Sequence, residues 1–142
     1  MSNALAIASV TAVLRDLLNN GLIDHDISGA VGGNVTVSML PPDRVFPPGS
    51  DESPRLNLFM HQVSPNAGWW NAAMPSRNAA GDRLTNPPLA LDLHYLLTAY
   101  GADNLHAEIL LGDAMQLLHE VPVLDRAALR RALQPSPLDG TG

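Results

Sequence analysis

Hydrophobic and polar residues alternate along three segments of the chain, as they do in strands with one buried face. Residues 89–97 place an apolar or aromatic side chain at every second position, and residues 56–63 show the same period. Residues 35–39 alternate over a shorter stretch that ends before two prolines. These segments predict strands, and the length of the 89–97 segment predicts that it lies centrally in the sheet.

Near the start of the chain, apolar residues recur at the three- and four-residue spacing of an amphipathic helix. Ser2 or Asn3 can cap this helix, and Gly21 is expected to stop it near Asn19. Residues 22–33 are ambiguous, because alternating aspartates and isoleucines also fit a short edge strand.

Two more helices are expected toward the end of the chain. Asp103 or Asn104 is expected to cap a helix that runs to about Glu120, where Pro122 ends it. Asp125 is expected to cap a short third helix that precedes the prolines of the tail.

Helices at both ends of a small sheet define an α+β domain. We therefore expect a mainly antiparallel sheet of about four strands, packed by the N-terminal helix and the C-terminal helices. One domain is expected over residues 1–134, followed by a Pro/Gly-rich tail over residues 135–142. The predicted core comprises the large apolar residues Leu5, Leu14, Leu17, Leu91, Leu93, Ile109 and Leu117.

The connection between the two longer strands, residues 67–88, contains several prolines and two adjacent tryptophans. Loops of this length without structure of their own are usually functional or disordered. One interpretation is that a tryptophan ring fills the core of the domain itself. The other is that the loop docks on another subunit, because tryptophan and arginine are favoured interface anchors. The second interpretation selects Asn66, Trp69, Trp70, Asn71, Arg77 and Arg83 as interface residues.

Composition limits the classes of partner. The formal net charge is −6, with 14 acidic residues against 8 basic ones, all of them arginine. Nucleic acid is therefore not expected as a partner, since phosphate binding needs clustered positive charge. The chain has no cysteine, which excludes disulfides and thiolate metal sites. No apolar run approaches membrane-spanning length, so membrane insertion is not expected.

Catalytic and metal-binding patterns are weak in this sequence. It contains no nucleophile elbow, phosphate-binding loop or zinc-protease motif. His106, Glu108 and His119 lack the three- or four-residue spacing of helical metal ligands. Asp92 and Asp113 could pair for acid–base chemistry, which leaves an enzyme as the alternative to a binding protein. We expect no enzyme, no cofactor and no metal.

Several long strings of the sequence resemble those of a known family. They are LNLFMHQVSPNAGW over residues 56–69, PLALDLHYLLTAYG over residues 88–101, AEILLG over residues 107–112 and SNALAI over residues 2–7. The chain resembles the N-terminal domain of the cap, or tail-terminator, protein of extracellular contractile injection systems. These are phage-tail-like particles of the antifeeding-prophage and Photorhabdus virulence-cassette type.

The resemblance implies a structural role rather than catalysis. Six copies are expected to form a ring that closes the inner tube at the end distal to the baseplate and contacts the last sheath layer. A helical stack of rings leaves one open interface, which a non-propagating subunit must cover. The implied partners are further copies of the chain, the inner tube protein and the sheath protein. Assembly is expected in the bacterial cytoplasm, with the particle retained or released. The alternative is an assembly adaptor at the neck, sheath or baseplate.

Overall fold

The computed structural model describes residues 5–70, 79–82 and 89–132. The protein is an α+β domain in which helices accompany a three-stranded mixed sheet. Its residues form two compact units, which are described separately below. Unit 1 comprises Met1–Phe59 and Leu96–Gly142, and unit 2 comprises Met60–Tyr95.

The sheet has the order β1-β2-β3, formed by β1 (Thr36–Ser38), β2 (Arg55–Pro65) and β3 (Leu91–Tyr100). β1 runs parallel to β2, so the sheet is mixed. It has three strands where about four were expected. The prediction of a central strand over residues 89–97 was wrong, because β2 lies between the other two. β2 also carries three successive buried residues, whereas β3 carries none.

A buried amide explains why β1 is so short. Asn57 of β2 is fully buried, and its Oδ1 accepts hydrogen bonds from the backbone N–H of Leu40 at 3.0 Å and from the Ser38 hydroxyl at 2.8 Å. Its Nδ2 donates to the carbonyl of Leu40 at 2.8 Å. The side chain thus satisfies the backbone groups of Leu40 that a longer ladder would use, and β1 leaves β2 after Ser38.

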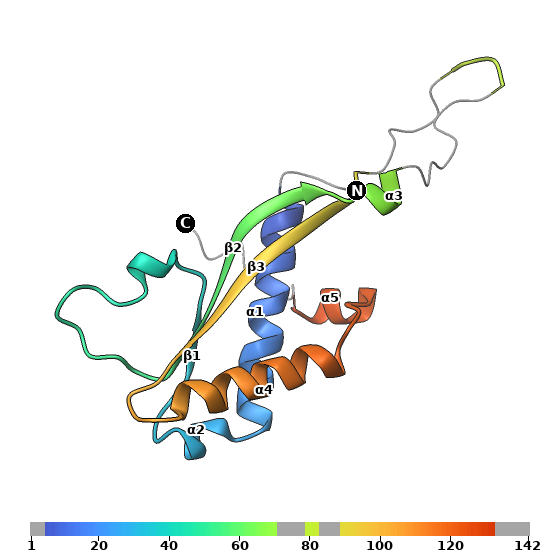
Figure 1. The fold of residues 1–142 in the computed structure, drawn as a ribbon. Coiled ribbons are helices and arrows are strands. Elements are labelled where there is room, and N and C mark those ends of the chain that lie inside the picture. The colour runs from blue at the N-terminus through green and yellow to red at the C-terminus, as the bar shows by residue number, and fades with distance from the viewer. Residues whose placement is uncertain (1–4, 71–78, 83–88, 133–142) are drawn as a thin grey trace. The chain divides into compact units, whose positions relative to one another are not determined.

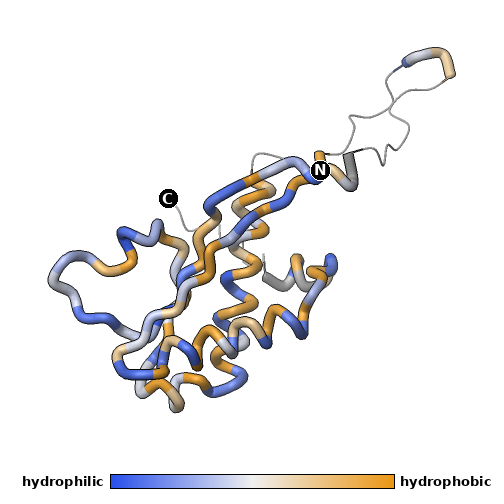
Figure 2. Tube along the Cα trace, viewed as in Figure 1, coloured by the Kyte–Doolittle hydropathy of each residue, from blue (hydrophilic) through white to orange (hydrophobic). Residues whose placement is uncertain are grey.

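The helices of unit 1 are α1 (Ala6–Asp24), α2 (Ile27–Ala30), α4 (His106–Glu120) and α5 (Arg126–Ala132), with a short 3₁₀ turn, η1, at Pro42–Arg44. α1 contacts β1, α2, α4 and α5, and it crosses α4 (Figure 1). Hydrophobic positions recur along both α1 and α4 (Figure 2). The buried hydrophobic residues are Ala12, Val13, Leu18, Leu22, Val31, Val45, Leu56, Leu58, Leu110, Ala114 and Leu117.

α1 does not stop at Gly21 but continues to Asp24. A Cβ atom at Gly21 would lie 2.4 Å from both Cδ atoms of Leu117, so this glycine marks the close crossing of α1 and α4. Burying Leu22 and Leu117 there offsets the roughly 1 kcal/mol that glycine costs inside a helix. The short edge strand considered for residues 22–33 is absent, and α2 follows α1 instead.

Only one of the seven predicted core residues, Leu117, is buried. Leu5 and Ile109 are 52% and 38% exposed, and the other four are half-buried. The buried side of α1 includes Ala12 and Gly21, because small residues let α1 approach its neighbours closely. The stripe that helical spacing predicted on α1, with Leu14 and Leu17, is therefore rotated away from the residues that make the contact.

The predicted helix caps also differ from the structure. α4 begins after Leu105, which adopts a left-handed conformation with φ of 69° and makes no side-chain cap bond, so the prediction of a cap from Asp103 or Asn104 was wrong. α1 begins after Leu5 without a side-chain cap, and Ser2 and Asn3 lie outside the described residues. The predicted boundary between domain and tail near residue 134 also lies outside them and stays a prediction.

Candidate interaction surfaces

The described part of unit 2 is built on a two-stranded ribbon, formed by residues 60–65 of β2 and 91–95 of β3. α3 (Ala67–Trp70) follows β2 directly. Asn66 joins the two strands where the ribbon ends. Its backbone N–H donates to the carbonyl of Ala90 at 3.0 Å, and its Nδ2 donates to Asp92 Oδ1 at 2.8 Å. Asn66 therefore links the two ends of the long connection between the strands.

The other predicted interface residues belong to that connection. Trp69 and Trp70 form the end of α3, a short helix that the sequence did not predict. Asn71, Arg77 and Arg83 lie outside the described residues. The interface role of all six predicted residues, Asn66 included, stays a prediction.

A polar network crosses the ribbon. The rings of His61 and His94 lie 6.2 Å apart between centroids, and the Ser64 hydroxyl lies 3.0 Å from His94 Nε2. Asp92 is engaged by Asn66, as described above. Within the residues that the structure describes, no group of three or more His, Asp or Glu side chains is placed to hold a metal ion.

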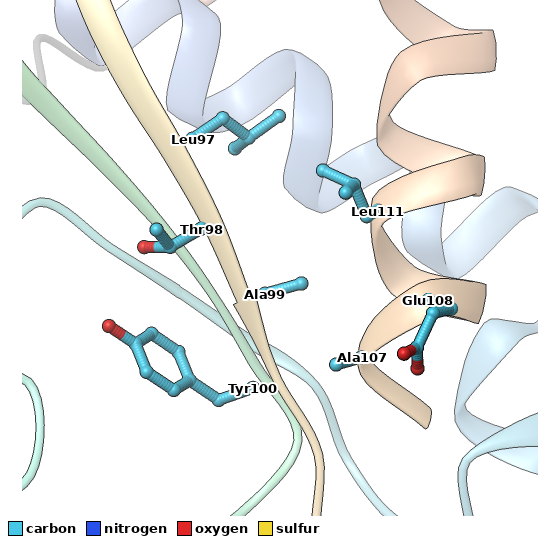
Figure 3. Close-up of a pocket in the computed structure, with 7 residues that line it drawn as sticks. All are labelled: Leu97, Thr98, Ala99, Tyr100, Ala107, Glu108 and Leu111. Atoms are coloured by element: carbon cyan, nitrogen blue, oxygen red, sulfur yellow. The ribbon is translucent and has the colours of Figure 1, made fainter. Parts of the chain in front are cut away.

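Unit 1 contains an apolar pocket of about 300 Å³ between the end of β3 and the first half of α4. Leu97 and Ala99 point from β3 toward α4, from which Ala107 and Leu111 approach (Figure 3). Glu108 is the one charged residue in the lining. Because β3 lies at the edge of the sheet, the pocket lies beside a strand that has a neighbour on one side only among the described strands. This arrangement suits an extended apolar segment.

Exposed apolar side chains continue along this part of unit 1. Leu105, Leu111 and Met115 are 67%, 37% and 62% exposed. Gly112 lies between the last two, and a Cβ atom there would have no neighbour within 4 Å. Glycine inside a helix costs about 0.5–1 kcal/mol relative to alanine, and no contact within the described residues requires it at this position.

A buried carboxylate joins α1 to α4. Asp113 of α4 is 8% exposed, and its Oδ1 lies 2.6 Å from Nδ1 of His25, at the C-terminal end of α1. The hydrogen bond to Asp113 is the main cause of the raised pKa of His25, and Glu120 and Asp24 raise it further. The sequence did not reveal this pair, because its members are 88 residues apart. Asp113 therefore pairs with His25 and not with Asp92, the acid–base partner that the sequence suggested.

The His25–Asp113 pair predicts a pH-dependent stability. Since the pKa of His25 is raised in the folded state, its contribution is fully present below the ordinary histidine pKa of about 6.5 and is lost as pH rises through the folded-state pKa. We expect the difference in melting temperature between the natural chain and His25→Gln to be larger near pH 5.5 than near pH 8.5. Glutamine keeps a donor for Asp113 but does not titrate. A difference that is equal at both pH values, measured by circular dichroism, would contradict this assignment.

The fold and its surfaces define a small α+β domain with an open-edged sheet and exposed apolar positions on its longest C-terminal helix. The family of Pvc16 N-terminal domains matches residues 9–141, and the chain belongs to this family. It is therefore a structural protein associated with contractile injection systems of the Photorhabdus virulence-cassette type. No curated protein and no solved structure gives a significant match to the chain. Within the described residues, no helix is long and apolar enough to cross a membrane.

Proposed function

We propose that this protein is the structural cap, or tail terminator, of a contractile injection system. The observation that carries the proposal is the family match over residues 9–141, which includes every described strand and nearly all of the helical residues. In this role, a homohexameric ring closes the end of the inner tube distal to the baseplate and contacts the last sheath layer. The mechanism is binding, and it requires no catalytic step and no cofactor.

The geometry of unit 1 supports a contact with an extended partner segment. Residues 97–100 of β3 lie at the edge of the sheet among the described strands, so a segment of the sheath protein can add to this end of the strand. Leu97, Ala99 and Leu111 then receive alternate apolar side chains of that segment in the 300 Å³ pocket. Glu108 at the pocket favours a segment that carries a basic side chain.

The proposed partners are thus further copies of the chain, the inner tube protein and the sheath protein. Assembly takes place in the bacterial cytoplasm, before the particle is retained or released. The net charge of −6 argues against nucleic acid as a partner of the ring.

Electron microscopy of particles that carry a tagged copy of the chain tests this role. We expect one six-fold ring per particle, at the end opposite the baseplate, and we expect particles made without the chain to lose control of tube and sheath length. A tagged baseplate protein is the matched control, because it labels the opposite end. Label at the baseplate or along the sheath would instead support the adaptor alternative. A chain that stays monomeric and never associates with tubes would rule out both.

A further inference from the structure

We propose that neighbouring copies of the chain join through the two outer edges of the ribbon in unit 2. Residues 60–64 of β2 in one copy pair with residues 91–94 of β3 in the next copy. This inference rests on the proposed ring, and it names the surface that holds the ring together.

The outer edge of β2 is open along the ribbon. β1 pairs with β2 only from Arg55 to Asn57, the first three residues of an eleven-residue strand. The bonds between Asn57 and Leu40 lead the chain away from the sheet after that point. Among the described strands, none therefore lies on that side of residues 60–64.

Among the described strands, the outer edge of β3 has no neighbour either, because the sheet order places β3 last. Exposed edge strands usually carry lysine or proline, which prevents pairing with other chains. β3 contains no lysine, arginine or proline over ten residues, and Asp92, its only carboxylate, accepts a hydrogen bond from Asn66. An edge of this length without such protection is suited to pairing.

Only two strands are paired along the ribbon, because β1 pairs with β2 over residues 55–57 alone. A pair of strands is less well supported than a sheet of three or more. Along the ribbon, His61, Gln62 and His94 are exposed, Val63 is 42% exposed and Leu93 is only half-buried. Strands from neighbouring copies would supply the missing hydrogen bonds and cover these side chains.

Strand direction identifies the occupant as a second copy in a head-to-tail arrangement. β1 and β2 are parallel and the sheet is mixed, so β2 and β3 run antiparallel. In a ring, β3 of one copy beside β2 of the next continues this alternation, and the same two edges meet at every contact. Pairing of two β3 edges would instead give a closed dimer and leave both β2 edges open.

The distribution of charge also favours the ribbon edges as the contact between copies. The chain has a net charge of −6, so most contacts between copies bring like charges together. Residues 60–64 carry no Asp, Glu, Lys or Arg, and residues 91–94 carry Asp92 alone. The two edges therefore meet with little repulsion between copies.

Cysteine cross-linking of the full chain tests the contact without ambiguity, because the natural chain contains no cysteine. Single variants His61→Cys, Gln62→Cys and Val63→Cys on β2 are each mixed with Leu93→Cys or His94→Cys on β3. Mixtures are oxidised under conditions in which light scattering shows rings, with inner tubes added where the chain alone stays monomeric. We expect disulfide-linked dimers only in mixtures. Because successive side chains of a strand point to opposite faces, Leu93→Cys should link either to the variants at 61 and 63 or to the variant at 62, and His94→Cys should link to the other set.

Each outcome decides between alternatives. Dimers formed by Leu93→Cys or His94→Cys alone indicate a two-fold contact and overturn the head-to-tail edge pairing. Rings that form without any cross-link overturn the surface but leave the proposed cap function intact. A chain that never forms rings, even with tubes present, overturns the cap function itself. The natural chain, oxidised in parallel, is the control and should give no linked dimer.

Discussion

Replacing Asn57 with leucine is expected to lower the free energy of unfolding by about 3–5 kcal/mol, a large fraction of the stability of a small domain. Asn57 is fully buried, and it satisfies both the N–H and the carbonyl of Leu40 as well as the Ser38 hydroxyl. Leucine has a similar size but leaves these groups without their partner. Urea unfolding followed by circular dichroism measures the loss.

Ser38→Ala is the matched control for this substitution. It removes one of the three hydrogen bonds to Asn57 and leaves both bonds to the Leu40 backbone. A loss of about 1 kcal/mol or less is expected, as for a single hydrogen bond. Hydrogen exchange should also show that Asn57→Leu, unlike the control, removes protection of the Leu40 amide. Equal losses for the two variants would contradict the role assigned to Asn57.

Replacing Gly101 with alanine is expected to destabilise the protein by about 2–3 kcal/mol, near the upper end of the usual cost of overpacking. A Cβ atom at Gly101 would lie 2.4 Å from His106 Cβ and 2.9 Å from the backbone nitrogen of Ala107. The second contact is with backbone, so the first turn of α4 must move and not only a side chain. Thermal unfolding measures the effect.

Gly112→Ala adds the same methyl group to the same chain and is expected to have the opposite sign. Its Cβ atom would meet nothing within 4 Å, and alanine in a helix is more stable than glycine by about 0.5–1 kcal/mol. A melting temperature that rises for Gly112→Ala and falls for Gly101→Ala would support the close approach of β3 and α4. A rise for both variants would show that the turn at Gly101 has room for a side chain.

Local pattern predicted most of the elements in this chain. Alternation predicted β2 and β3, the spacing of apolar residues predicted α1 and α4, and α5 was predicted at Arg126. The central position predicted for residues 89–97 was wrong, because alternation describes the faces of one strand and not its neighbours. The early end of β1 depends on Asn57, which binds a backbone segment 17 residues away. Gly21 was interpreted as a stop signal because its contact with Leu117 is not local.

The interaction surfaces were less accessible to sequence reasoning than the family was. Long strings within β2, β3 and α4 led to the family because they are contiguous. Asn66 was selected for its residue type, but its bonds to Ala90 and Asp92 require the strands to be paired first. The pocket beside β3 combines residues from two elements, and Glu108 had been considered only as a metal ligand. Surfaces of this kind depend on which edges the fold leaves open.

Unit 1 is formed by two segments that are far apart in the order of synthesis, Met1–Phe59 and Leu96–Gly142. Leu18 and Leu22 of α1 are synthesised before unit 2, whereas Leu110 and Leu117 of α4 are synthesised after it. The core of unit 1 therefore cannot close on a nascent chain that ends within unit 2. We therefore expect products that terminate within unit 2 to keep an incomplete core and to be more susceptible to proteases than chains that include α4.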